Sequence, residues 1–473
     1  MLTYDLSQRG QLSIYEYLYQ CIKQDILDGA IAAGSRLPSK REFASHHQIS
    51  LKTAENTYEQ LLTEGYIYSA ERRGYFAASL DTDKNDRQSH YQNYMPFSAY
   101  TADTDTSYFA DFASNQAAIE YFPYDTWAKV MRGVLSLRNP DMLKTVPFQG
   151  VYALRESIAR YLYGFRGMTV SPDQIVIGAG TEYLYGRLIQ LLGRDRIYAL
   201  ENPGYRKIAK IYQVNDVSWK YIDVDENGMQ IDKLSESGAD IVHVSPGHHF
   251  PTGSIMPIGR RKMLLNWAEA KPDRYIIEDD YDSEFRFSHR PVPAIQSLNH
   301  NHRVIYLNTF SKTLVPSIRI SYMVLPNKLM ERYIHTMNFY SCTVSAFEQY
   351  ALAAFMDNGY FERHIHRMKK YYRAKRDSML RVFENSRLCR YAVIDEKDAG
   401  SHFLIHLDTT LSDTQLKWLA REHGIYLDCL SEYCETGKEQ HAHTIIVNYS
   451  DLDEKSFGRA LDILMLAVVD NLL

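Results

Sequence analysis

The sequence lacks several features that would assign it to a specialised class of protein. It has only five cysteines in 473 residues, and their scatter without CxxC pairs argues against a disulfide framework or a zinc site. No apolar run approaches the roughly 20 residues of a membrane span. The N-terminus also lacks the apolar core of a signal peptide. We therefore expect a reduced, cytoplasmic protein.

An excess of positive charge is also missing. The 53 basic and 58 acidic side chains give a formal net charge of -5, so the chain as a whole is not a nucleic-acid binder by charge. Any contact with DNA must come from a local basic surface. Hydrophobic residues make up 45% of the chain, which is ordinary for a globular protein. The length predicts at least two domains.

Residues 1–80 have the pattern of a compact helical unit. Apolar residues at helical spacing predict a first helix over Ile14–Leu27. Ser39, with Glu42 three residues later, forms a capping box that begins a second helix. A third helix is predicted over about 50–64. These three helices are expected to form one small domain.

The segment after the third helix predicts a hairpin and then a domain boundary. Two short aromatic runs within 66–77 flank a charged turn, which is typical of a two-stranded wing. Residues 81–106 are polar with little apolar periodicity, and we interpret them as a linker. The second domain then spans 107–473, with a smaller α+β lobe over about 360–473.

From residue 107 onward, short β-branched runs alternate with amphipathic stretches. This alternation predicts a mainly parallel α/β sheet, with active residues at the carboxyl ends of the strands. The predicted strands are Gln174–Ile177, Arg196–Leu200, Ile241–Val244, Tyr275–Ile277 and Val304–Leu307.

A lysine follows the last of these strands in the segment Thr309-Phe310-Ser311-Lys312. A lysine just past a buried strand suits a Schiff base with pyridoxal phosphate (PLP), because shielding lowers the pKa of its amine. The hydroxyls of Thr309 and Ser311 can hold a phosphate. Taken alone, this pattern more often belongs to an ordinary surface lysine, so the context of Lys312 decides.

Acidic and aromatic residues at two other strand ends supply that context. PLP acts as an electron sink only if its pyridine nitrogen stays protonated, which requires a carboxylate partner. Asp279 is placed for that role, and Tyr281 can donate to the ring 3-oxygen. His248, which also follows a strand, is a second candidate for the 3-oxygen.

Further residues suit the phosphate and the ring. Gly180 and Thr181 lie in a glycine-rich turn that leads into a helix, and amides at a helix N-terminus suit phosphate. Arg319, seven residues after Lys312, can close on the same phosphate. Tyr205 can stack on the ring. A tight turn, a surface ion pair and a core aromatic are the alternative interpretations of these residues in isolation.

Together these motifs resemble fold-type I aminotransferases. The sequence is more similar still to the MocR/GabR-type regulators, in which a GntR-like winged helix-turn-helix is fused to such a PLP-dependent domain. The matching segments are LPSKREFA, IGAGT, ENPGYR, HHFPTG, IIEDDYDSEF, TFSK and SIRISYMVLP, in the family's order. The resemblance implies a multidomain protein: an N-terminal winged helix and an α/β aminotransferase fold with a small C-terminal α+β lobe.

The resemblance gives each cofactor residue a role. Lys312 would form the Schiff base, Asp279 would face the pyridine nitrogen and Tyr281 the 3-oxygen. The phosphate would be held by Thr181, Ser311 and Arg319, and the ring would stack on Tyr205.

The resemblance also assigns a DNA-binding surface to the first domain. The start of the second helix would meet phosphates, the third helix would enter the major groove, and the wing turn would follow the backbone or minor groove. Lys52 can reach phosphate or guanine, and Asn56 can read a base edge. Leu51 departs from the arginine that is usual at this position, so the base preference should differ. The residues are Ser39, Lys40, Arg41, Ser50, Lys52, Thr53, Asn56, Arg72 and Arg73.

The effector is less well specified. An amino acid needs a carboxylate anchor, usually a bidentate arginine. In GABA-responsive relatives one such arginine lies two residues after the stacking tyrosine, where this chain has Lys207, beside Arg206. A second arginine is missing from 439–443. GABA is therefore not favoured, and another amino acid held by Lys207, or PLP itself, is expected.

Two functions from different classes fit these observations. The first is a PLP-dependent transcription regulator that binds a double-stranded DNA operator and senses its effector at Lys312. The second is a working aminotransferase with an accessory DNA-binding domain. The basic winged-helix pattern favours the regulator, because a metabolic enzyme does not need it. The family resemblance further implies a head-to-tail homodimer, with Schiff-base exchange repositioning the DNA-binding domains.

Overall fold

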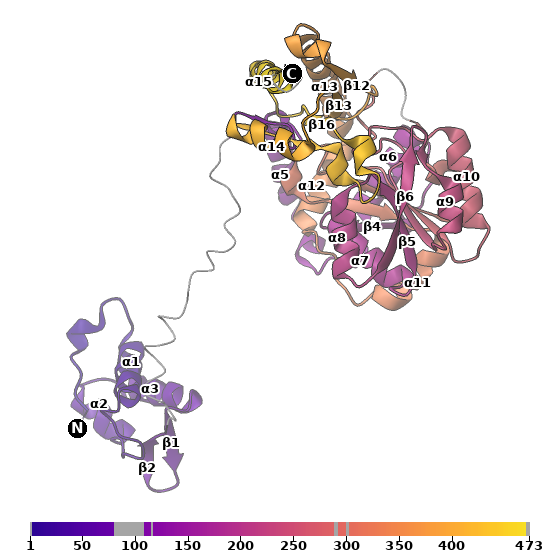
Figure 1. Cartoon of the computed structure of the whole chain (residues 1–473). Helices are drawn as coiled ribbons and strands as arrows, with labels where there is room; N and C mark the ends of the chain where they lie inside the picture. The colour runs from indigo at the N-terminus through magenta and orange to yellow at the C-terminus, as the bar shows by residue number, and fades with distance from the viewer. Residues whose placement is uncertain (1, 80–107, 115–116, 288–291, 299–301, 470–473) are drawn as a thin grey trace. The chain divides into compact units, whose positions relative to one another are not determined.

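The chain divides into two compact units, Met1–Asp105 and Thr106–Leu473. They are drawn in Figure 1 from a computed structural model. The predicted linker at 81–106 lies outside the described residues. None of the described helices is both long and apolar enough to cross a membrane. The structure describes residues 2–79, 108–114, 117–287, 292–298 and 302–469.

The first unit has the three helices and the hairpin that the sequence predicts. Each helix begins at a serine, because a serine hydroxyl accepts a hydrogen bond from a backbone N–H of the first turn. The capping box of Ser39 and Glu42 is confirmed. The elements are α1 (Ile14–Leu27), α2 (Lys40–His46), α3 (Leu51–Thr63), β1 (Ile67–Ala70) and β2 (Gly74–Ala77).

One apolar core holds this unit together. Leu18 and Ile22 from α1, Phe43 from α2, and Tyr58 and Leu61 from α3 are all fully buried. The apolar stripe of each helix therefore faces the same centre, as its helical periodicity requires. Because this core is independent of the second unit, the three helices form a domain with its own hydrophobic centre.

The second unit is built on an eight-stranded sheet in the order β4-β11-β10-β9-β8-β5-β6-β7 (Figure 1). Neighbouring strands from β10 to β6 pair in parallel, so the mainly parallel sheet that the sequence predicts is confirmed. The strands are β4 (Ile175–Gly178), β5 (Ile197–Asn202), β6 (Ser218–Asp225), β7 (Gly228–Met229), β8 (Ile241–Val244), β9 (Tyr275–Asp279), β10 (Val304–Thr309) and β11 (Ser321–Val324).

Two strands depart from the parallel pattern: β7, which is antiparallel to β6, and β11. β11 lies between β4 and β10 and is antiparallel to both. Because two reversals cancel, β4 runs in the same direction as β10 and the other parallel strands. The carboxyl ends of β4, β5, β8, β9 and β10 therefore share one edge of the sheet, which is where ligands bind in such folds.

Helices cover both faces of this sheet. Val176 and Ile277 pack with α7, α8 and α11, whereas the alternate residues Ile177 and Ile276 belong to cores on the other face. This double burial is typical of parallel sheets. The helices are α5 (Tyr124–Ser136), α6 (Tyr152–Arg166), α7 (Thr181–Leu192), α8 (Arg206–Val214), α9 (Ile231–Glu236), α10 (Ile258–Glu269), α11 (Asn327–Met337) and α12 (Ala346–Asp357).

The C-terminal part forms a smaller lobe around the antiparallel sheet β12-β13-β16-β15. The elements of this lobe are α13 (Tyr360–Glu384), β12 (Ala392–Asp395), β13 (His402–Leu407), α14 (Asp413–Glu422), β14 (Ile425–Tyr426), β15 (Asp428–Cys429), β16 (Thr444–Asn448) and α15 (Glu454–Val469).

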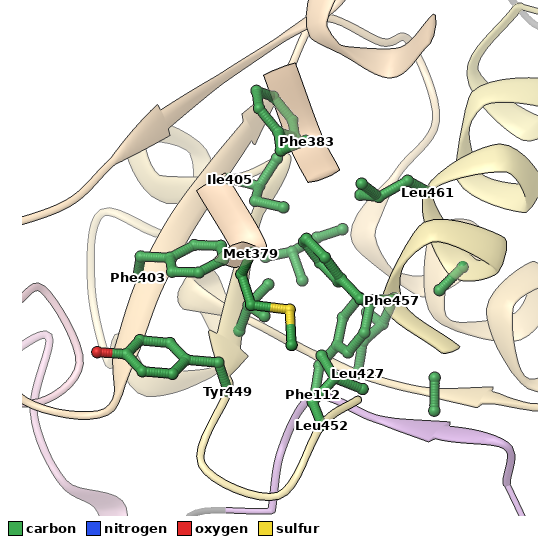
Figure 2. Close-up of a cluster of buried hydrophobic side chains, with 14 of the residues drawn as sticks. Phe112, Met379, Phe383, Phe403, Ile405, Leu427, Tyr449, Leu452, Phe457 and Leu461 are labelled. Carbon is green, nitrogen blue, oxygen red and sulfur yellow. The ribbon is translucent and has the colours of Figure 1, made fainter. Parts of the chain in front are cut away.

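The small lobe also includes a segment from much earlier in the chain. Strand β3 (Ala110–Asp111) pairs with β14, and the next residue, Phe112, is fully buried against Phe457 with ring centroids 5.8 Å apart. Figure 2 shows Phe112 among the aromatic and aliphatic side chains of this core. The sequence placed the lobe at about 360–473 and missed this segment, because a two-residue strand has no detectable periodicity.

Candidate functional site

A cavity of about 240 Å³ lies at the shared edge of the parallel strands. Five loops that follow β4, β5, β8, β9 and β10 supply most of its lining. The structure therefore brings together most of the predicted cofactor residues from segments more than a hundred residues apart. Those that line the cavity are Thr181, Tyr205, Asp279, Tyr281, Thr309, Ser311, Lys312 and Arg319.

Lys312 lies in the loop that follows β10 and contributes to the cavity wall. Burial lowers the pKa of its amine to about 8, because the charged form loses its hydration. The negative charge of Asp282 acts in the opposite direction and favours the ammonium. An amine with this pKa is substantially neutral at mildly basic pH, which a nucleophilic lysine requires.

Asp279 is the last residue of β9 and is almost completely buried. Tyr185 on α7 donates a hydrogen bond to its Oδ2, and His243 Nε2 lies 3.7 Å from the same oxygen. Its other oxygen, Oδ1, is buried and has no hydrogen-bond partner among the residues that the structure describes. A buried acceptor without a partner lowers the stability of the fold, so this atom is suited to a ligand that donates a hydrogen bond.

The turn between β4 and α7 forms an open cradle. Gly180 has φ 93° and precedes Thr181, the first residue of α7. A Cβ at Gly180 would lie 2.3 Å from Nη2 of Arg319, so only glycine allows the guanidinium to approach here. Ser311 Oγ is buried without a hydrogen-bond partner within the described part of the chain. These groups suit an anion at the N-terminus of α7.

Thr309 connects this cradle to the neighbouring strand through hydrogen bonds. Its Oγ1 accepts hydrogen bonds from Ser321 Oγ at 2.7 Å and from the backbone N–H of Ser311 at 3.2 Å. The first bond links β10 to β11, one of the strands that the sequence did not predict. The second bond holds the backbone of Ser311 at the cavity, which its side chain lines.

Glu182 forms ion pairs with two cations at the cavity. Its carboxylate accepts hydrogen bonds from Lys207 Nζ through Oε1 and from Arg319 Nη2 through Oε2, the latter at 2.7 Å. Both pairs are roughly half exposed. Lys207 therefore lines the cavity as predicted, but its charge is shared with an acid. Arg206 is exposed and is not part of the cavity lining.

The structure places His248 behind the cavity wall. Its Nδ1 lies 2.7 Å from Asp282 Oδ2 and 3.4 Å from the hydroxyl of Tyr281. Tyr281 lines the cavity, and burial together with the neighbouring acids raises the pKa of its phenol. Of the two residues predicted to face the 3-oxygen, only Tyr281 is therefore at the cavity surface.

Several lining residues were missed by the sequence analysis. Tyr185 lies one helical turn after Thr181, so the i, i+4 spacing on α7 would have placed both on one face. Phe250, edge-to-face with Tyr205 at a centroid distance of 5.9 Å, carries no comparable sequence pattern. The other lining residues not predicted are Glu182, Ile208, Ser245 and Pro316.

The first unit has the geometry of a winged helix-turn-helix. Ser39 and Ser50 are helix caps, with Ser50 Oγ accepting from the N–H of Thr53 at 3.0 Å. Lys52, with 72% of its side chain exposed, has only a distant ion pair with Glu55 at 4.0 Å. The first turn of α3 therefore presents a cation to solvent, next to capped helix ends.

The remaining predicted DNA contacts are distributed over α2, α3 and the wing. Lys40 lies over the ring of Tyr75, with its Nζ 5.3 Å from the ring centroid. Asn56 is partly exposed on α3. Arg41, Arg72 and Arg73 are exposed. The predicted basic residues of the first unit are therefore at its surface, on α2, on α3 and in the turn between β1 and β2.

Comparison with known proteins identifies both units. Residues 14–76 match the model of the bacterial regulatory proteins of the gntR family. Residues 110–441 match the model of class I and II aminotransferases. The chain belongs to the MocR-type regulators of the GntR family. As a member, it combines a DNA-binding helix-turn-helix domain with an aminotransferase-like domain.

Two relatives share this architecture along most of their length. The uncharacterized HTH-type transcriptional regulator YdeL from Bacillus subtilis (strain 168) is 37% identical over 423 residues, which are 89% of each chain. The probable rhizopine catabolism regulatory protein MocR from Rhizobium meliloti is 29% identical, over 97% of this chain and 94% of that protein.

The fold of the second unit is also that of solved aminotransferases. A crystal structure of Pyrococcus horikoshii kynurenine aminotransferase, in complex with PMP, KYN as substrates and KYA as products, superposes with a TM-score of 0.68. The identity is 24%, and the match covers 78% of this chain and 92% of that chain. At this identity the likeness establishes the fold of this MocR-type regulator.

The aminotransferase fold implies PLP, and the residues of the cavity fit this cofactor. The buried Oδ1 of Asp279 matches the N–H of a protonated pyridine ring. The buried hydroxyl of Ser311 and the cradle at Gly180 match a phosphate group. Lys312 is adjacent in the same cavity. The pyridine nitrogen, the phosphate and the aldehyde of PLP therefore each have a chemically suitable partner.

The lowered pKa of Lys312 predicts unusual reactivity. In cofactor-free protein, reductive methylation of Lys312 should rise with pH around a midpoint of about 8, because only the neutral amine attacks the aldehyde. A model amine with the ordinary lysine pKa of about 10.4, added to the same reaction, serves as the internal control. Peptide mass spectrometry measures the modification. A Lys312 midpoint that coincides with that of the model amine would contradict the buried environment.

Proposed function

We propose that this MocR-type regulator binds PLP at Lys312 and senses an amino acid, or PLP itself, through Schiff-base chemistry that changes its binding to DNA. The observation that carries this proposal is the meeting of Lys312 with the unpartnered acceptor of Asp279 in one cavity. The same chain carries a winged helix with exposed basic residues. A ligand-binding unit and a DNA-reading unit together make a regulator.

Each cofactor contact is assigned to a residue of the cavity. Lys312 Nζ would bond to the aldehyde carbon, Asp279 would hold the pyridine nitrogen protonated, and Tyr281 would donate to the 3-oxygen. When bound, PLP supplies an electron-accepting ring and a carbon that exchanges one amine for another. The ring would stack on Tyr205. The phosphate would be held by Gly180, Thr181, Thr309, Ser311 and Arg319.

The effector site is assigned to the cavity mouth. Lys207 would form an ion pair with the carboxylate of an amino acid. Its present hydrogen bond to Glu182 would then have to break, or Lys207 would have to contact both carboxylates. A lysine gives a single point charge in place of the bidentate fork of an arginine. This favours a weakly held signal molecule over a tightly oriented substrate. Arg206, exposed beside Lys207, is the weaker candidate.

A working aminotransferase is the second candidate. The observation that favours it is the amine of Lys312, whose pKa of about 8 also suits proton transfer in catalysis. Sustained formation of a keto acid from an added amino acid would support this function. A change in cofactor absorbance without sustained turnover would support the sensor.

The DNA-binding unit would place α3 in the major groove, with the start of α2 on the phosphates. Ser39, Lys40 and Arg41 would contact phosphates from α2. Ser50, Lys52, Thr53 and Asn56 would be presented by α3, and Arg72 and Arg73 by the wing. A head-to-tail homodimer would read two operator half-sites, since dimeric helix-turn-helix proteins bind sites that mirror their symmetry.

The cofactor assignment predicts a spectral loss. Wild-type protein mixed with PLP should develop a visible absorption band, and Lys312→Ala should lose it because no amine remains to bond the aldehyde. Lys328→Ala, an exposed lysine on α11, is the matched control and should keep the band. Absorption spectra and borohydride trapping measure the result. An equal band in the Lys312→Ala protein would remove the cofactor assignment.

The DNA assignment predicts a change in salt dependence. Arg41→Ala should weaken binding to all DNA sequences and reduce the slope of log affinity against log salt by about 0.9, the value for one phosphate contact. Fluorescence anisotropy with duplex DNA at several salt concentrations measures the slope. Lys328→Ala again serves as the control. A slope unchanged by Arg41→Ala would show that this side chain contacts no phosphate.

A further inference from the structure

A buried imidazole–carboxylate pair lies directly behind Tyr281. His248 Nδ1 is 2.7 Å from Asp282 Oδ2, and their side chains are only 3% and 9% exposed. The same nitrogen is 3.4 Å from the hydroxyl of Tyr281. Only Tyr281 of the three lines the cavity. The pair can therefore act on a ligand through Tyr281.

The proton arrangement follows from the chemistry of the groups. A carboxylate can only accept hydrogen bonds, so Nδ1 of His248 must carry a proton when it bonds Asp282. The same N–H then faces the oxygen of Tyr281 as a weaker, second acceptor. Because this oxygen receives a hydrogen bond on that side, the phenolic proton of Tyr281 remains available for donation into the cavity.

We propose that His248 and Asp282 form a positioning pair that directs the hydroxyl of Tyr281 toward the cofactor. This inference rests on the proposed binding of PLP at Lys312. His248 thus receives a role different from the direct contact expected from the sequence. It acts through Tyr281, and Asp282 acts through His248.

Packing from two sides fixes the imidazole. A Cβ at Gly400, in the small lobe, would lie 2.1 Å from Cε1 of His248, so only glycine leaves room for the ring. The backbone of Gly400 is held by hydrogen bonds to Phe285 O and from the hydroxyl of Tyr449, both at 2.8 Å. The ring of His402 lies 4.9 Å from that of His248. Such confinement leaves the ring little freedom to turn away from Tyr281.

Other titratable groups lie near His248 and Asp282. Burial lowers the pKa of His402 well below its ordinary range, and burial lowers the pKa of His249 to about 3, so both stay neutral near pH 7. Burial raises the pKa of Glu201 to about 8. Arg166 and Arg286 line a small cavity together with His248 and Asp282. The other titratable groups near Tyr281, His248 or Asp282 are Glu201, His249, Asp279, Asp280, Lys312 and His402.

The expected effect on the cofactor has a definite sign. A hydrogen bond from Tyr281 stabilises negative charge on the 3-oxygen, and this weakens the attraction of that oxygen for a proton on Lys312 Nζ. The hydrogen bond from Tyr281 therefore lowers the pKa of Lys312 Nζ in the PLP-bound wild-type protein. Without His248 and Asp282, Tyr281 can turn away and donate elsewhere, and the pKa of Lys312 Nζ rises.

The test is a pH titration of the visible absorption of the PLP-loaded full-length protein. His248→Leu should raise the apparent pKa of the band by about one unit, as expected for loss of one hydrogen bond to a charged group. His248→Asn keeps a donor near the position of Nδ1 and should restore most of the wild-type value. Tyr161→Phe is the matched control, because Tyr161 bonds Glu284 of the same segment.

A double-mutant cycle separates positioning from general loosening. In a Tyr281→Phe background, His248→Leu should cause no further shift, since its effect passes through the missing hydroxyl. A full shift in that background, or an unchanged pKa in His248→Leu alone, overturns the inference. If the leucine variant does not fold, His248→Gln, which moves the donor away from the position of Nδ1, replaces it.

These outcomes are distinct from failure of the proposed function. A wild-type protein that develops no visible band with PLP overturns the proposed function and this inference together. A normal band with identical titrations in wild-type and His248→Leu proteins overturns the inference alone.

Discussion

The burial of one amine constrains the rest of the second unit. Lowering the pKa of Lys312 from 10.5 to about 8 corresponds to a preference for the neutral form on the order of 3 kcal/mol. The surrounding structure must hold the lysine out of water strongly enough to outweigh the charge of Asp282, which favours the ammonium. The strand end of β10 does this, because parallel strands are covered by helices on both faces and open only at one edge. The same edge then collects the other strand-end residues around the amine.

The polar residues of the cavity are held by neighbouring side chains. Asp279 contacts Tyr185 and His243, and Tyr281 is backed by His248 and Asp282. Glu182 forms ion pairs with two cations of the lining. The small lobe closes one side through Gly400 and His402, which contact the same imidazole. A ligand that displaces Tyr281 or His248 would therefore also act on the small lobe. In this way a reaction at Lys312 would change the structure away from the cavity.

The sequence predicts the parts of the site that local chemistry determines. Lys312 and Asp279 were predicted because Asp279 ends one buried strand and Lys312 follows another, and the structure brings both to the same cavity. The winged helix was identifiable from its capping serines and helical periodicity. The position of His248 behind the cavity wall could not be predicted from the sequence. No local pattern distinguishes a histidine that faces a cavity from one that lies behind a tyrosine. The pairing of Glu182 with Lys207, and the contribution of Phe112 to the small lobe, depend on long-range packing that no local pattern records.

If chemistry at Lys312 controls DNA binding, a ligand that reacts there must change the affinity for DNA. This is tested by measuring the affinity of the PLP-loaded protein for a DNA fragment selected from random sequence, while an amino acid that changes the visible spectrum is titrated. DNA affinity and absorbance should change over the same concentration range, and DNA binding of Lys312→Ala should not respond. A spectral change that leaves DNA affinity constant, or an equal response in Lys312→Ala, would contradict it.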